Sequence, residues 1–140
     1  MNLNKAMLIG NITRDPESRT TPDGTIVTSF SVATNLRWTD KSGQRQDRAE
    51  YHNIVAWRKL GEICAQYLKK GSKIYVEGRI QTRSWQDQQG QKHWRTEIIA
   101  ENMIMLDKLG NTQPNPAVPE QPVEEAPVAD EAINVEEIPF

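Results

Sequence analysis

Alternation of apolar and polar residues dominates the first hundred positions of the chain. Successive side chains of a β-strand point to opposite faces, so a period of two indicates a strand with one buried face. The long segment from Thr25 to Trp38 exceeds the usual strand length of about 5 to 6 residues. We therefore expect its second half to leave the body of the protein as the arm of a hairpin. In all, the pattern predicts strands over residues 5–12, 25–38, 50–57, 72–80 and 98–106.

Turn residues separate these strands. Asp40-Lys-Ser-Gly43 follows the long strand, and Asp87-Gln-Gln-Gly90 follows the strand that begins at residue 72 and continues past Gly78. Asp and Gly favour turns, because Asp bonds to nearby backbone amides and Gly adopts left-handed conformations. We expect both segments to be the tips of long hairpin arms.

A helical period of 3.6 residues occurs once, over residues 59–70. Lys69 and Lys70 suit the negative end of the helix dipole, and Gly71 is the expected residue just after the helix. These positions explain both lysines without a ligand. The apolar stripe that should face the core consists of Leu60, Ile63, Cys64, Tyr67 and Leu68.

Five strands with one helix between the third and the fourth are the arrangement of the OB-fold, a five-stranded Greek-key barrel that commonly binds oligonucleotides or oligosaccharides. We predict an all-β OB-fold domain over residues 1–109. From Gly110 onward the composition changes, since 6 of the 8 prolines lie there with few large apolar residues. We expect residues 110–140 to form a disordered acidic tail.

The net charge of −2 conceals a division of the chain. Residues 1–109 hold all 17 Lys and Arg but 12 of the 19 acidic residues, a net charge of +5, and the remainder holds seven acids and no base. A basic body suits an anionic partner. No apolar run approaches the roughly 20 residues that span a bilayer, and no signal peptide pattern begins the chain, so we expect a cytoplasmic protein. Cys64, His52 and His93 lack the spacing of a metal site, which predicts a buried thiol and no metal or cofactor.

Large aromatic rings and positive charges recur together at three places. Tyr51 and Trp57 share one face of their strand, and Lys59 follows. Flat rings that stack bases, beside cations that neutralise phosphates, form the usual surface for single-stranded nucleic acid. For any single ring, packing beneath a loop is an alternative. The other two places are the hairpin arms, which carry Trp38 with Lys41 and Arg83 with Trp85.

Two other functions compete with binding of single-stranded DNA. An RNA-binding OB-fold module would use the same rings and cations. A hydrolytic enzyme would rest on Asp47, Glu50 and His52, but no nucleophile, metal cluster or phosphate loop accompanies them, and we predict no catalysis.

Motifs spread over the whole domain resemble the bacterial single-stranded DNA-binding protein family. The similarity spans about residues 1–106 and resumes at the C-terminus. It implies a homotetramer of OB-fold domains, associated with the nucleoid, that wraps single-stranded DNA in replication, recombination and repair. The residues that carry it are Asn4-Lys5, Leu8-Ile9-Gly10-Asn11, Asp15-Pro16-Glu17, Tyr51-His52, Lys59-Leu60, Tyr67-Leu68-Lys69-Lys70-Gly71 and Val76-Glu77-Gly78.

The resemblance also implies roles for single residues. Trp38, Tyr51, Trp57 and Trp85 fall at base-stacking positions, and Lys41, Lys59, Lys70 and Arg83 fall at basic positions along the DNA path. Tyr51 and Trp57 differ in type from relatives that often have Trp and Phe there, yet both remain aromatic.

Three further positions complete what the resemblance implies. Gln81 and Ser84 stand where relatives often carry cations, which predicts a shallower salt dependence of binding. His52 matches a subunit-interface position, and a core histidine with satisfied hydrogen bonds is the alternative. The last five residues, Glu136, Glu137, Ile138, Pro139 and Phe140, are similar to the peptide with which the family recruits replication, recombination and repair proteins.

Overall fold

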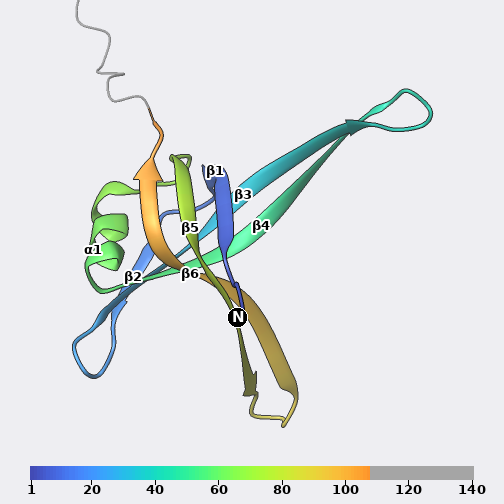
Figure 1. The fold of residues 1–140 in the computed structure, drawn as a ribbon. Helices are drawn as coiled ribbons and strands as arrows, with labels where there is room; N and C mark the ends of the chain where they lie inside the picture. The colour runs from blue at the N-terminus through green and yellow to red at the C-terminus, as the bar shows by residue number, and fades with distance from the viewer. Residues whose placement is uncertain (108–140) are drawn as a thin grey trace, which may run out of the picture. The chain divides into compact units, whose positions relative to one another are not determined.

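The computed structural model describes residues 1–107. Five strands close a barrel in the order β1-β5-β6-β4-β3, because β1 pairs with β3 as well as with β5 (Figure 1). The sixth strand, β2, pairs with β3 outside the barrel. The predicted five-stranded barrel with one helix is therefore confirmed. Its elements are β1 (Ala6–Ile12), β2 (Glu17–Thr20), β3 (Ile26–Thr39), β4 (Arg45–Trp57), α1 (Arg58–Tyr67), β5 (Lys73–Gln86) and β6 (Lys92–Met105).

Close backbone approach seals the barrel where β1 meets β3. The pairing is short and joins Asn11 to Ala33 and Ile12 to Val32. Gly10 precedes it, and a Cβ atom there would lie 2.3 Å from the Ala33 carbonyl oxygen. Glycine is therefore required at this position for the first strand to reach the third.

The core consists of the inward residues of the alternating strands. On β4, Ile54 and Ala56 are fully buried, whereas Tyr51 and Trp57 point outward. The division predicted for this strand is thus confirmed. The buried cluster comprises Ile12, Phe30, Val32, Ile54, Ala56, Cys64, Leu68, Ile74, Val76, Ile98 and Ala100.

The helix is shorter than its periodicity predicts. It ends at Tyr67, because Leu68 turns to an extended conformation with its side chain buried in the core. The prediction that Lys69 and Lys70 end the helix and that Gly71 caps it is wrong. Gly71 instead has a φ of 90° in the turn before β5. Tyr67, predicted on the buried stripe, is 57% exposed.

Cys64 belongs to the helix and is buried against the core, as the sequence predicts. Burial raises the pKa of its thiol to about 11, so the thiolate that reacts or binds metals is disfavoured. Among residues 1–107, no group of three or more His, Cys, Asp and Glu side chains lies close enough to hold a metal ion.

The end of the last strand departs from prediction. Ile98 and Ala100 are buried, but Ile104, Met105 and Leu106 are 49%, 47% and 41% exposed. Their assignment to the core is wrong. Ile104 lies opposite Tyr75 on the outer face of the sheet, and Met105 and Leu106 stand where β6 ends and pairs only with β5. The strand β2 was not predicted either, since its four residues, Glu-Ser-Arg-Thr, are all exposed and carry no apolar period.

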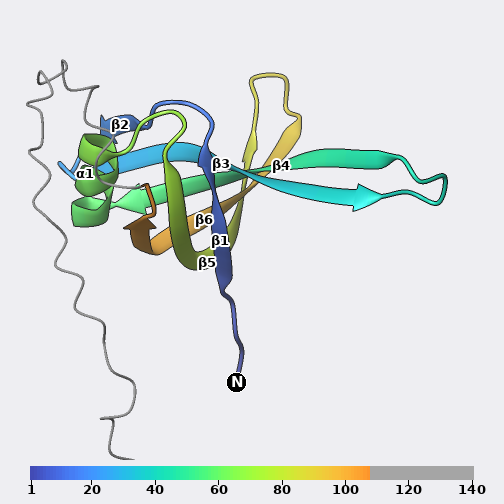
Figure 2. The ribbon, with the colours of Figure 1, turned by 90° about the horizontal axis from the view of Figure 1, so that it is seen from above.

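Two hairpin arms, β3–β4 and β5–β6, project from the barrel in different directions, and α1 lies away from the tip of the β3–β4 arm (Figures 1 and 2). Their predicted tips are confirmed and share one construction. The backbone amide of Asp40 donates to the carbonyl oxygen of Gln44, and that of Asp87 to Gln91, at 2.9 Å each. Gly43 supplies the positive φ that the first turn requires.

The two tip aspartates bind their own turns. Asp40 accepts hydrogen bonds from the hydroxyl and amide of Ser42, the side chain of Gln46 and the amide of Gln44. These bonds, led by the Ser42 hydroxyl, lower the pKa of the Asp40 carboxyl to about 2. The carboxylate therefore stays ionised, and keeps these hydrogen bonds, at a more acidic pH than a free aspartate would.

Within the described part of the chain, no helix has the length and apolar character that a membrane crossing requires. The predicted tail and its tip, Glu136 to Phe140, lie outside the described residues.

Candidate nucleic-acid interface

An open hollow of about 510 Å³ lies on the outer surface of the barrel, bordered by β2, β3, β4, β5 and β6. We call it the basic groove, because five arginines and two glutamates line it. Its walls are outward side chains of strands whose inward neighbours form the core. The lining residues are Arg14, Glu17, Arg19, Ser29, Val55, Trp57, Arg79, Gln81, Arg83, Arg95, Glu97 and Ile99.

A carboxylate in the floor of the basic groove organises its cations. Glu97 is only 8% exposed, and its Oε1 lies 3.3 Å from the Nε atoms of both Arg83 and Arg95. The Nε of Arg95 is buried and makes no well-aligned hydrogen bond, but an NH2 group of Arg95 donates to Oδ1 of Asn53 at 3.1 Å. Two guanidinium groups around one buried carboxylate leave net positive charge facing the groove.

Trp57 stands at one end of the basic groove, at the junction of β4 and the helix. The next residue, Arg58, has a φ of 57°, the only positive φ of a non-glycine residue in the described chain. This left-handed residue turns the chain sharply into α1. Trp57 remains 43% exposed, and a second hollow continues from it past Arg58, Arg79 and Glu101.

Trp85 extends the basic groove onto the β5–β6 arm. The Cζ atom of Arg83 lies 5.1 Å from the centre of its ring. The His93 ring stacks on it with the centroids 5.7 Å apart and an angle of 25° between the planes. Nε2 of His93 also lies 2.8 Å from Oδ2 of Asp87, and this bond is the main cause that lowers the pKa of the Asp87 carboxyl. The indole of Trp85 is thus held in place before any ligand arrives.

The β3–β4 arm divides its aromatic rings between two faces. Tyr51 pairs with Ala33 and lies on the same face as Trp57, and it is 67% exposed. Trp38 pairs with Gln46 and lies on the opposite face. Three of the four predicted stacking rings, those of Tyr51, Trp57 and Trp85, therefore share the face of the basic groove, and Trp38 does not.

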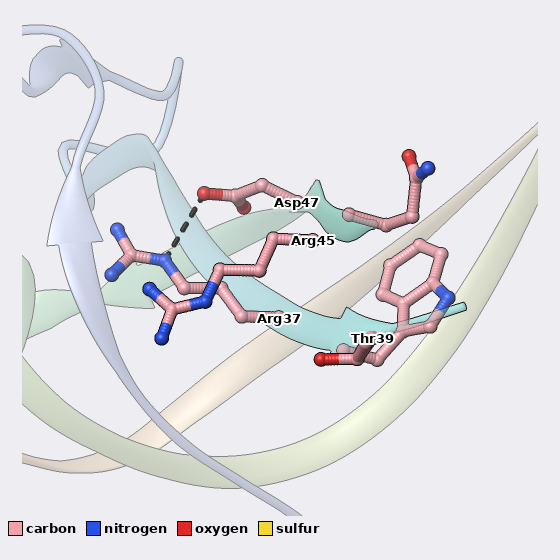
Figure 3. A pocket seen from close by; sticks show the side chains of 6 residues that line it. Arg37, Thr39, Arg45 and Asp47 are labelled. Carbon is pink, nitrogen blue, oxygen red and sulfur yellow. Dashed lines mark hydrogen bonds and ion pairs between the residues drawn. The ribbon is translucent and has the colours of Figure 1, made fainter. Parts of the chain in front are cut away.

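A further hollow of about 500 Å³ surrounds the arm near Trp38. Figure 3 shows Arg37 and Arg45 extending in the same direction from the arm. Arg37 pairs with Asp47 at 3.1 Å. The arm thus carries cations on the face opposite Trp38. A nucleic-acid strand that contacts both these cations and Trp38 would have to cross the edge of the arm.

The predicted basic residues lie apart from one another. Lys41 lies in the tip of the β3–β4 arm. Lys59 is the second residue of the helix, and its Nζ lies 3.9 Å from Oε2 of Glu62. The amide of Lys70 donates to Asp15 at 2.8 Å in the turn after the helix, and Lys70 does not line the basic groove. Arg83 alone of the four predicted cations lines it.

The residues considered for hydrolysis do not gather. His52 and Glu50 point to the inward side of β4, where His52 shares a hydrogen bond of 2.9 Å with the Thr34 hydroxyl. Asp47 lies on the other face, paired with Arg37. The half-buried His52 has a partner within its own chain, as the core-histidine alternative requires.

Four arginines of the basic groove were not among the predicted binding residues. Arg79 on β5 and Arg95 on β6 lie on the same face of the arm as Trp85. The period of two along each strand could therefore have predicted that they face the groove. Arg14 and Arg19 join the groove only through the unpredicted β2 region. The shallower salt dependence expected from Gln81 stays a prediction, and Arg95 argues against it, because it adds a cation directly opposite Arg83.

Comparison with known proteins identifies the relatives of this chain. Residues 3–106 match the model of the single-strand binding protein family. The chain is 53% identical over 105 residues to single-stranded DNA-binding protein 1 of Chlorobaculum tepidum, which covers 74% of this chain and 65% of the relative. It is 52% identical over 106 residues to the single-stranded DNA-binding protein of Neisseria meningitidis, which covers 76% of this chain and 61% of the relative. The aligned part is thus less than two thirds of either relative.

Solved structures give the same relationship. The SSB of Plasmodium falciparum, solved in complex with ssDNA, superposes with a TM-score of 0.71 at 34% identity, over 76% of this chain and 97% of that one. A deletion mutant of the single-stranded DNA-binding protein of Thermus aquaticus gives a TM-score of 0.67 at 32% identity, over 75% of this chain and 51% of that one. With its five-stranded barrel and basic groove, the chain belongs to the single-strand binding protein family.

Proposed function

We propose that this protein binds single-stranded DNA without sequence preference and protects it during replication, recombination and repair. The observation that carries the proposal is the basic groove, where the Trp57 ring and five arginines share one open surface next to Trp85. The names of the relatives and the DNA-bound Plasmodium falciparum structure support it.

In this proposal, bases stack on Tyr51, Trp57 and Trp85 and the strand reaches Trp38 over the edge of the β3–β4 arm. Stacking uses the face of a base, which every nucleotide offers, so binding tolerates any sequence. Arg83 holds phosphates in the groove, while Lys41, Lys59 and Lys70 take phosphates outside it. Residues 1–109 form the binding domain, and the protein works at the nucleoid.

Titration with oligo(dT), mixed-sequence single strands, duplex DNA and oligo(U) tests this function. We expect quenching of tryptophan fluorescence by both single-stranded DNAs with similar affinity, weaker binding of duplex, and displacement of oligo(U) by oligo(dT). Fluorescence that no DNA quenches would contradict the proposal. A preference for oligo(U) would favour the RNA-binding module instead.

We further propose a homotetramer, assembled through an apolar row on the outer face of β1, β5 and β6. Ile9, Tyr75 and Ile104 lie directly opposite one another across these strands. Ile9 and Ile104 are 57% and 49% exposed, and Met7 beside them is exposed as well. The Tyr75 hydroxyl donates to Glu77 at 2.5 Å, which satisfies it and leaves the ring free for apolar contact. Adjoining exposed apolar residues of this kind indicate a protein interface.

Replacing both Ile9 and Ile104 with arginine should lower the molar mass in light scattering from that of a tetramer to that of a smaller species. Burying two unpaired charges per subunit outweighs the apolar gain of assembly. Leu36→Arg, at an exposed apolar residue of the β3–β4 arm, is the matched control and should leave the mass unchanged. A mass that the double variant retains would exclude this face. His52, the predicted interface residue, lies on β4 and not on the strands of this row. The molar mass of His52→Ala is measured in the same way.

The acidic segment after residue 109 has a separate proposed role. Its final residues, Glu136 to Phe140, combine two acids, two apolar side chains and a proline. That combination suits an apolar pocket with a basic rim on another protein. We propose that replication, recombination and repair proteins bind this tip.

Deletion of Phe140 should abolish partner binding and leave affinity for DNA unchanged or slightly raised. The ring anchors the tip, whereas the acids of the tail compete with phosphates for the basic body. Pull-down of replication and repair proteins by the full chain and by the deletion variant measures the first effect, and oligo(dT) titration measures the second. Equal recovery of partners by both proteins would refute the role of the tip.

A further inference from the structure

The β5–β6 arm has a second face, which the basic groove does not use. Cross-strand partners lie on the same side of a sheet, so Ser84 and Trp94 share one face, and their neighbours Trp85 and His93 share the other. Trp94 therefore points away from the stack around Trp85. The residues of this second face are Thr82, Ser84, Gln86, Lys92, Trp94 and Thr96.

Trp94 is unusually open. It is 66% exposed, against 43% for Trp38, Trp57 and Trp85. Its neighbours on the second face are short or polar, and Thr82 and Thr96 bond to each other at 3.0 Å. An indole that serves packing would cover apolar atoms, yet this ring stands among hydroxyl, amide and ammonium groups.

The charge on the second face favours an anionic ligand. Lys92 lies on it next to Trp94, and none of its six residues is acidic. Ser84, Gln86 and Lys92 also border a hollow of about 300 Å³ whose other walls are Trp85 and Trp94. This hollow connects the two faces around the edge of the arm. A ring, a cation and neutral hydrogen-bonding groups repeat the chemistry of the basic groove.

We propose that single-stranded DNA leaving the basic groove at Trp85 passes round the β5–β6 arm, where one base stacks on Trp94 and Lys92 takes a phosphate. The inference rests on the proposed function. A second copy of this chain is the other occupant to consider, but its contact would favour apolar neighbours around the ring, and the other five residues of the second face are all polar.

Fluorescence of Trp94 alone tests the contact directly. In the full chain, Trp38, Trp57 and Trp85 are replaced with phenylalanine, which keeps rings at the other sites and leaves Trp94 as the one tryptophan. Saturation with a long oligo(dT) should quench its emission and shield it from acrylamide. Emission and acrylamide access that stay the same at saturation would overturn the proposal.

Affinity provides the second test. Trp94→Ala should weaken binding of a long oligo(dT) about fivefold or more, whereas Trp94→Phe should keep most of the affinity. Thr96→Ala is the control, because it shortens a side chain on the same face without removing an aromatic ring, and it should have little effect on affinity.

Trp85→Ala separates the second-face contact from the proposed function. If Trp85→Ala weakens binding and Trp94→Ala does not, only the second-face contact fails. If neither variant weakens binding and DNA does not quench the fluorescence of the unchanged protein, the proposed function itself fails. A lower molar mass for Trp94→Ala with unchanged DNA affinity would assign the ring to a second copy of the chain and overturn the proposal.

Discussion

A variant with both Trp57 and Trp85 replaced by alanine should bind oligo(dT) about thirtyfold more weakly or worse. Each base stacked on an aromatic ring contributes roughly 1 to 3 kcal/mol, so two rings together account for about 2 kcal/mol or more. The two residues come from β4 and β5 and stack different bases, which makes their losses add. Fluorescence anisotropy of a labelled oligo(dT) at constant salt measures the change.

The matched control carries phenylalanine at both positions. It retains the rings and should lose much less affinity than the alanine variant. Both indoles are 43% exposed, so neither change should prevent folding, which thermal denaturation verifies. An alanine variant that folds and binds within twofold of the unchanged protein would show that the basic groove is not the DNA path.

The second large effect concerns stability. Ile54→Ala should reduce the free energy of unfolding by about 2 to 5 kcal/mol, because it removes a buried side chain and leaves a cavity. Ile54 is fully buried and pairs with Phe30 on one side and Ile98 on the other, at the centre of the barrel. Urea denaturation followed by circular dichroism measures the loss, with all proteins at the same concentration because assembly contributes to stability.

Ile80→Ala is the control for this change. The same atoms are removed from a side chain that is 46% exposed at the base of the β5–β6 arm. Since about half of that side chain is already in water, we expect a loss of about 1 kcal/mol. Equal losses for both variants would contradict the position of Ile54 at the centre of the core.

The burial of Ile54 and Ala56 also explains why Trp57 faces outward. Trp57 points outward because Ile54 and Ala56 point inward on the same strand, and the period of two leaves no other choice. A slip of β4 by one residue would turn the core residues outward and the binding rings inward. Core packing and the orientation of the binding face are therefore consequences of one register.

Local patterns in the sequence were sufficient for the five barrel strands, the helix and both arms, but not for β2. Asp40 and Asp87 predict their tips because an aspartate binds amides only a few residues away. The positions of Trp38 and Tyr51 on opposite faces of the arm also follow from counting, once their pairing is known. Errors occurred where tertiary packing decides the outcome. Leu68 ends the helix early because the core takes its side chain, and Ile104 is exposed because it lies on the outer face of β6, opposite Tyr75.

The sequence by itself therefore determined which side chains share a strand face, since alternation and turn chemistry act over a few residues. Only the tertiary structure decided which faces meet. Arg19 on β2, Arg79 on β5 and Arg95 on β6 line one groove because the barrel closes through pairings between residues far apart in the chain. Pairing between distant strands depends on the whole set of competing registers, and no local window of sequence contains that information.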